Sequence, residues 1–222
     1  MTFGMNNFDK NKLNKKQSRM LVETSYLSSA TALIWIALYY LPIGGAFFRI
    51  ALPLPLALLQ IRRGTKAGVD GVFLTVLLLS ILMGPLRGPL ILFPYAILSF
   101  WLGFCWYKRY SWWLSWFVGV LIGTLGFIIR VFALSILVGE NLWVIITRAG
   151  ASIIEKFLDL TNIIFVPDVI QIQIVGVSLI VLQEIIFVLT LHLIAFWIFP
   201  RLKAHVPAPP PILSRLAILE SQ

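Results

Sequence analysis

The chain has 222 residues, 59% of them hydrophobic and 12% charged, and its mean hydropathy is +0.93. Because soluble domains carry about 25% charged residues, this composition predicts a protein embedded in a lipid bilayer and excludes a soluble enzyme. The net charge of +9 is spread over cations between the apolar segments, so we expect contact with membrane lipid and none with nucleic acid.

The first 23 residues are polar and basic and contain five of the cations. They predict a cytoplasmic arm at the membrane surface. The apolar stretch behind them has no small-residue cleavage site, so we expect a retained membrane helix rather than a signal peptide. Three parts are therefore predicted: the arm at 1–23, a membrane domain at 24–199 and a Pro-rich cytoplasmic tail at 200–222.

Six apolar segments in the membrane domain are candidate membrane spans. Pro53 and Pro55 remove backbone donors from the second segment, so we expect that helix to be kinked or broken near its middle. The sixth segment is longer than a bilayer requires and is expected to tilt or to project. The predicted fold is all-α, a polytopic bundle of six transmembrane helices. The spans are expected at about 24–41, 46–61, 69–83, 90–107, 112–138 and 169–199.

The connection at 139–168 carries apolar residues at helical spacing from Leu142 to Leu160, with charged residues on the other faces. This pattern predicts an amphipathic helix between spans five and six, lying on the membrane surface or capping a pocket.

The distribution of cations predicts the orientation. With six spans, thirteen of the 18 Lys and Arg residues lie on the side of the two termini. Only Arg87, Arg148 and Lys156 lie on the opposite side. Cytoplasmic loops carry the excess of Lys and Arg, so we predict a multi-pass protein of the inner (plasma) membrane with both ends in the cytoplasm.

Arg49, Arg130 and Glu184 lie inside the predicted spans, where each charge is costly. Arg130 in span five and Glu184 in span six are close enough in depth for a structural ion pair, or one or both line a ligand cavity. Arg49 in span two either reaches the outer headgroups or belongs to the same cavity.

Arg49, Arg87 and Arg130 all fall in the predicted outer half, which favours a ligand with a carboxylate or phosphate. Gln173 adds a hydrogen-bonding group, and Tyr39 is either a pocket wall or an interfacial aromatic residue. The predicted ligand-binding residues are therefore Arg49, Arg87, Arg130, Glu184, Gln173 and Tyr39.

Span one carries small residues at i, i+3, i+4 and i+7: Ser25, Ser28, Ser29 and Ala32. Such a stripe lets another helix approach closely. The partner helix belongs either to the same bundle or to a separate membrane subunit.

The sequence has no G-x-S-x-G, H-E-x-x-H or P-loop motif, and its one cysteine and two histidines predict neither a disulfide nor a metal site. We expect no catalytic activity and no cofactor. Energy for any active transport would have to come from another chain.

The run PLPLALLQIRRGTKAGVDGVFLTVLLLSILMG, with the basic arm and the small-residue stripe, resembles the substrate-binding (S) components of energy-coupling-factor vitamin transporters. More closely, the chain resembles the YybS-like family of bacterial membrane proteins. The resemblance to S components implies a ligand site near the outer face. It also implies a first helix that docks on a transmembrane T subunit through an Ala-x-x-x-Ala motif, which here reads Ser28-x-x-x-Ala32.

Two functions from different classes follow. The first is a substrate-binding subunit for a small, anionic metabolite or vitamin, working with separate T and ATPase subunits. The alternative is a non-transporting assembly or scaffold protein that binds a larger membrane complex. A self-sufficient ion-coupled carrier is less favoured, because only one acid lies deep in a span and no inverted repeat is visible.

Overall fold

The computed structural model describes residues 5–161 and 167–210. Within these residues the chain forms helices and no strand. The α-helices are α1 (Met5–Tyr40), α2 (Gly45–Ala51), α3 (Leu54–Arg63), α4 (Thr65–Met83), α5 (Tyr95–Lys108), α6 (Trp112–Val138), α7 (Trp143–Thr161) and α8 (Val169–Ile198). Two short 3₁₀ helices are η1 (Gly88–Leu92) and η2 (Pro200–Leu202).

Six helical segments in the described residues are long and apolar enough to cross a bilayer, which confirms the predicted polytopic bundle. They are Lys15–Tyr40, Gly45–Arg63, Thr65–Met83, Gly88–Lys108, Trp112–Val138 and Val169–Ile198. The predicted orientation stays a prediction from charge.

Prolines interrupt two of these segments. The second span is broken between α2 and α3, where Pro53 precedes the first residue of α3. This break was expected. The fourth span also divides, into η1 and α5 on either side of Pro94, the residue before α5. A proline has no backbone N–H to continue the helical ladder, which explains both breaks.

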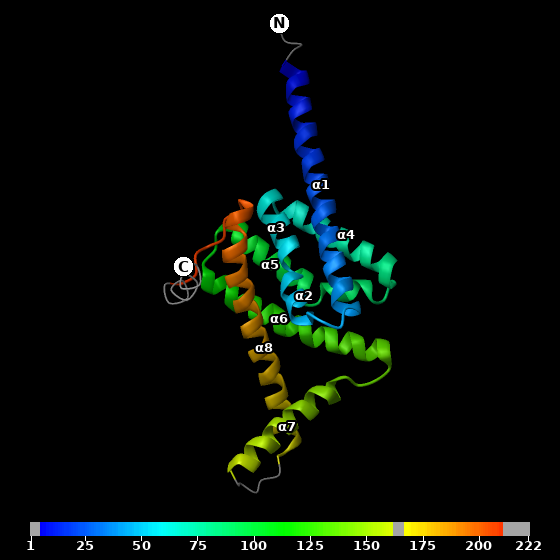
Figure 1. Ribbon diagram of the computed structural model, residues 1–222, viewed down its shortest axis with the longest axis vertical. Coiled ribbons are helices and arrows are strands. Elements are labelled where there is room, and N and C mark those ends of the chain that lie inside the picture. The colour runs from blue at the N-terminus through cyan, green and yellow to red at the C-terminus, as the bar shows by residue number, and fades with distance from the viewer. Residues whose placement is uncertain (1–4, 162–166, 211–222) are drawn as a thin grey trace.

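The predicted arm and the first span form a single helix, α1, which begins at Met5. Its N-terminal part extends away from the remaining helices (Figure 1). At the point where α1 reaches the bundle, Glu23 pairs with Arg63 at the end of α3. Arg63 Nε and Nη2 donate to the two carboxylate oxygens at 2.7 and 2.6 Å. This bidentate ion pair holds α1 against α3.

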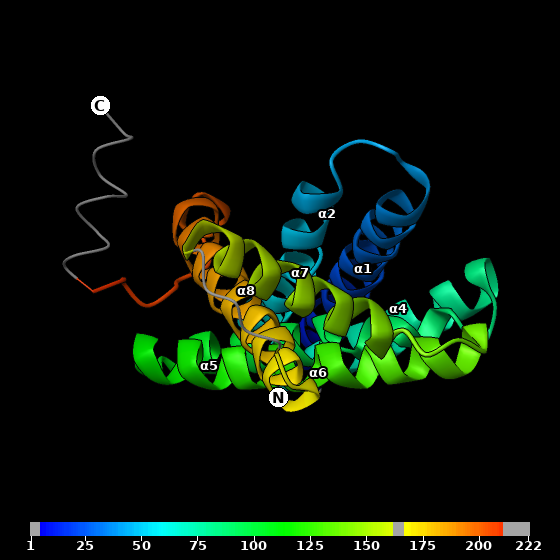
Figure 2. The same cartoon turned by 90° about the horizontal axis from the view of Figure 1, so that it is seen from below.

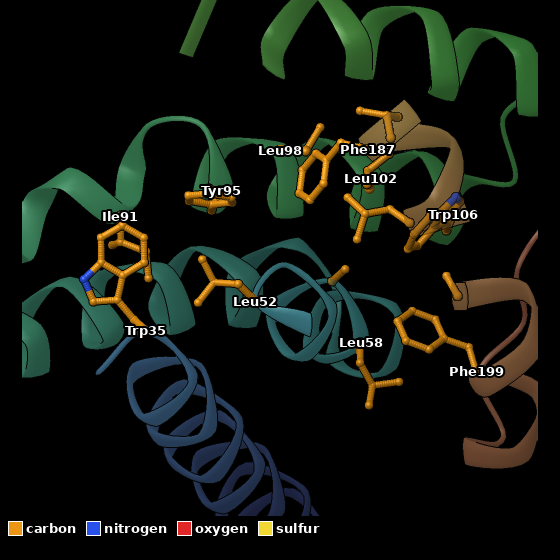
Figure 3. Close-up of a cluster of buried hydrophobic side chains, with 14 of the residues drawn as sticks. Trp35, Leu52, Leu58, Ile91, Tyr95, Leu98, Leu102, Trp106, Phe187 and Phe199 are labelled. Atoms are coloured by element: carbon orange, nitrogen blue, oxygen red, sulfur yellow. The ribbon is translucent and has the colours of Figure 1, made fainter. Parts of the chain in front are cut away.

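The core forms around α3, which packs against α1, α4 and α5. Figure 3 shows large side chains from α1, α3, α5 and α8 meeting in this core. Where α1 meets α4, Ser28 Oγ donates to the Gly71 carbonyl at 3.0 Å. Small residues on both helices allow that close approach.

The amphipathic helix predicted between spans five and six is confirmed as α7. It crosses the first turns of α8, at the end of the molecule opposite to the N-terminus (Figures 1 and 2). A Cβ atom on Gly150 would lie 2.8 Å from the Ile172 carbonyl oxygen, and one on Gly176 would lie 3.2 Å from Ile146. Glycine on both helices is therefore what lets the two backbones touch.

Candidate functional site

The charged residues inside the spans are brought together by the break between α2 and α3. Arg49 of α2 turns toward α8, and its Nη2 lies 3.4 Å from Oε1 of Glu184. The Glu184 side chain is completely buried, whereas that of Arg49 is 28% exposed. With its amide oxygen turned toward Arg49, Gln183 accepts hydrogen bonds from both terminal nitrogens of the guanidinium, at 2.6 Å from Nη2 and 3.2 Å from Nη1.

The structure therefore changes the pairing that the sequence suggested. Residue depth allowed an ion pair between Arg130 and Glu184 as one of two alternatives. Among the described residues, Glu184 instead forms its ion pair with Arg49. The pair joins α2 to α8, and its two residues are separated by 135 positions in the sequence. A buried carboxylate requires a partner of this kind.

Gly123 of α6 provides the space for Glu184. A Cβ atom at position 123 would lie only 2.5 Å from Oε2 of Glu184. That oxygen is buried and has no hydrogen-bond partner among the described residues. The carboxylate is thus held from one side by Arg49 and confined on the other by α6.

A row of aromatic rings connects Arg49 with Arg130. The Phe187 and Tyr95 ring centroids are 6.1 Å apart, and those of Tyr95 and Trp35 are 5.7 Å apart. Figure 3 shows these three side chains in the core. The Arg49 guanidinium carbon is 5.5 Å from the Phe187 centroid, and that of Arg130 is 5.0 Å from Trp35 and 5.5 Å from Tyr95. Both guanidiniums therefore lie over aromatic rings of the bundle, at distances typical of cation–π contacts.

Arg130 differs from Arg49 because it has no carboxylate partner among the described residues. Its Nη2 donates to the Tyr39 hydroxyl at 3.4 Å, and its Nε is buried without a hydrogen-bond acceptor. Tyr39 is 42% exposed, so the row of rings reaches the surface at this end. We call Arg49, Arg130, Glu184, Trp35, Tyr39, Tyr95 and Phe187 the guanidinium–aromatic cluster.

The cluster lies away from the Glu23–Arg63 pair. Tyr39 and Glu23 are sixteen residues apart on the continuous helix α1, which corresponds to about 24 Å at 1.5 Å per residue. With both termini in the cytoplasm, as the charges predict, the cluster would lie in the outer half of the bundle.

Two of the predicted ligand-binding residues lie in other places. Arg87 lines an open pocket of about 470 Å³ together with Gly84 and Leu137, where the end of α4 meets the end of α6. Gln173 lines a second open pocket, of about 370 Å³, with Trp143 between α7 and α8. Arg49 and Arg130 line neither pocket.

The small-residue stripe of the first helix is partly buried and partly exposed. Ser28 and Ala32 are buried inside the bundle, where Ser28 bonds to α4. Ser25 and Ser29 are exposed. The packing partner of Ser28 is thus a helix of the same chain, and only Ser25 and Ser29 remain accessible to a second subunit.

One buried polar pair was not predicted. Ser115 Oγ lies 2.8 Å from Nε2 of His192, whose Nδ1 lies 2.8 Å from the Val188 carbonyl oxygen. The imidazole sits between Trp106 and Trp112, with ring centroids 5.4 and 5.2 Å away. Ser115 and His192 are almost completely buried, so we interpret them as a structural link between α6 and α8.

Comparison with known proteins identifies a family. Residues 29–215 match the profile of a family described as "Predicted membrane protein (DUF2232)". A segment of 54 residues is 43% identical to "Uncharacterized protein YybS" of Bacillus subtilis (strain 168). The match covers 24% of this chain and 18% of that relative, so it spans less than a fifth of the relative's length. No solved structure gives a significant match. The YybS-like resemblance is supported, whereas the resemblance to S components stays a prediction.

Proposed function

This chain belongs to the DUF2232 family of predicted membrane proteins, and we propose that it is an integral membrane subunit that binds a small anionic metabolite for import. One observation carries the proposal. The Arg130 guanidinium is partly buried against Trp35 and Tyr95 and has no carboxylate partner among the described residues. A cation in this position requires either a counter-ion or an energetic compensation from elsewhere.

A ligand carboxylate or phosphate would supply that counter-ion. The guanidinium offers five N–H donors in a planar fork that matches both groups. Within the described part of the chain, the Tyr39 hydroxyl is the one acceptor of these donors, at 3.4 Å, which is a long hydrogen bond. The Tyr39 hydroxyl also lies at the surface end of the cluster, so it is placed to meet a ligand that enters there.

Transport would need further subunits. The chain has no P-loop, so energy would come from a separate ATPase acting through a transmembrane T subunit, as the resemblance to energy-coupling-factor S components implies. The surface offered to such a subunit would be the exposed side of α1 at Ser25 and Ser29. Small side chains there allow a second helix to approach closely.

Ligand binding can be measured directly on detergent-purified protein. A panel of small carboxylates and phosphates is tested for an increase in the unfolding temperature, because a ligand that binds the folded state stabilises it. We expect at least one anion to stabilise the wild type and to have no effect on Arg130→Gln. Arg148→Gln is the matched control, since Arg148 is exposed on α7. Equal stabilisation of both variants, or no stabilisation by any anion, would refute the proposal.

The scaffold function is the second candidate, and it is favoured by one observation: the N-terminal part of α1 extends beyond the bundle (Figure 1). Affinity purification from native membranes distinguishes the two functions. Recovery of an ATPase pair with a T subunit would support import. Recovery of an unrelated multi-subunit membrane complex at fixed stoichiometry would support the scaffold.

A further inference from the structure

The cluster contains unequal numbers of opposite charges. Two guanidiniums, Arg49 and Arg130, share the row of rings with one carboxylate, Glu184. Glu184 lies against Arg49, and Gln183 adds a neutral acceptor to the same guanidinium. With Glu184 ionised in this ion pair, the charge of Arg49 is cancelled within the protein, and the net charge of the cluster is one positive charge, located at Arg130.

We propose that Glu184 sets the charge of the ligand: by cancelling Arg49, it makes the site select an oxyanion with one negative charge over an oxyanion with two. This inference rests on the proposed anion-binding function and adds to it the charge class of the ligand. Glu184 acts here as a specificity-determining residue without touching the ligand.

The geometry explains why Arg49 would not serve a second anionic group. Its guanidinium is held by Glu184 and Gln183 on one side and lies 5.5 Å from the Phe187 ring and 6.0 Å from the Phe127 ring. Its Nε is buried and has no acceptor among the described residues. Moving Arg49 toward a ligand would leave the fully buried Glu184 without its counter-ion, which is unfavourable in a medium of low dielectric constant.

A second negative charge on the ligand would therefore stay uncompensated. At Arg130 it would meet only aromatic rings and the Tyr39 hydroxyl among the described contacts. The faces of aromatic rings are electronegative and repel anions. A monocarboxylate and the phosphodiester of a lipid headgroup both carry one negative charge, so both have the required chemistry.

The test compares two probes with the same ring, benzoate with one carboxylate and phthalate with two, at pH 8 in detergent. Affinities are obtained from the concentration dependence of the unfolding temperature. For the wild type we expect benzoate to bind at least about tenfold more tightly than phthalate, because an unpaired like charge in a partly buried site is strongly disfavoured.

Three variants isolate the role of Glu184. Glu184→Gln keeps the shape of the side chain and leaves Arg49 uncompensated, so the preference should shift toward phthalate by at least about tenfold. The double variant Arg49→Gln/Glu184→Gln again has one cation, and its benzoate preference should match that of the wild type. Arg49→Gln alone leaves Glu184 to cancel Arg130, so both probes should lose binding. The double variant and Arg49→Gln keep the test decisive if Glu184→Gln fails to fold.

Nanodiscs distinguish the two sources of a singly charged oxyanion. If anionic phosphatidylglycerol competes with benzoate in the wild type and not in Arg130→Gln, the native ligand is a lipid headgroup. If the lipid has no effect, this headgroup is excluded and the oxyanion is assigned to a soluble monoanion such as the benzoate probe. Both results agree with the inference.

Different results would overturn the two proposals. Equal or tighter binding of phthalate to the wild type, or an unchanged probe preference in Glu184→Gln, would overturn the charge selection but leave anion binding in place. A lack of Arg130-dependent binding for both probes would overturn the binding function itself.

Discussion

The contact between Gly123 and Glu184 provides a sharp test of the packing that supports the site. In Gly123→Ala the added Cβ atom would lie 2.5 Å from Oε2 and 3.3 Å from Cδ of Glu184. The carboxylate would have to retreat by roughly 1 Å to reach an ordinary contact distance. Its Oε1 is held by Arg49 at 3.4 Å, so the retreat must strain α6, α8 or the ion pair.

The expected cost combines three contributions. Overpacking of a tight interior destabilises the fold by about 1–3 kcal/mol. Replacing Gly by Ala inside a helix stabilises it by about 1 kcal/mol, because Ala has the higher helix propensity. Disrupting a buried ion pair costs about 3–5 kcal/mol when one charge is left unpaired, and here the disruption is partial. We expect Gly123→Ala to lower the free energy of unfolding by about 2–4 kcal/mol.

Reversible unfolding in mixed micelles with increasing SDS, followed by tryptophan fluorescence, measures this difference. Gly45→Ala is the matched control, because the nearest atom to its added Cβ is Leu38 Cδ1 at 4.0 Å. We expect that substitution to change the stability by less than about 0.5 kcal/mol. If Gly123→Ala were as stable as Gly45→Ala, the described fit of Glu184 against α6 would be wrong.

Three further predictions concern the core, the α7–α8 crossing and the orientation. His192→Ala removes an almost fully buried ring and leaves the Ser115 hydroxyl without its partner, so thermal unfolding should show a loss of about 2–5 kcal/mol. Gly150→Ala places a Cβ atom 2.8 Å from a backbone carbonyl of α8, so hydrogen exchange in α7 should increase, whereas an unchanged exchange rate would contradict the close crossing. In a Cys105→Ala background, Lys15→Cys should react with a membrane-impermeant maleimide only in inside-out vesicles and Arg148→Cys only in intact cells; the reverse pattern would refute the predicted orientation.

Much of the architecture could be predicted from the sequence, because the features that produce it are local. An apolar run long enough to cross a bilayer shows itself within about twenty residues. Pro53 lacks the backbone N–H that would continue a helix, so an interruption near it could be expected from the sequence, and the helical spacing of apolar residues at 139–168 indicated α7. The division at Pro94 is an exception, because whether a proline bends a span or ends a helix depends on the surrounding packing.

The residue pairing in the candidate site could not be predicted from the sequence, because it depends on the tertiary structure. Counting residues along spans places Arg130 and Glu184 at similar depth only if the helices run parallel, whereas α6 and α8 cross at a steep angle (Figure 1). The end of α2 turns Arg49 inward, and Glu184 pairs with it across 135 positions. Which face of each helix points inward is set by the summed packing of the whole bundle. The sequence alone therefore determined that charged residues lie within the spans, and only the fold decided that Arg49 pairs with Glu184 while Arg130 lies beside aromatic rings.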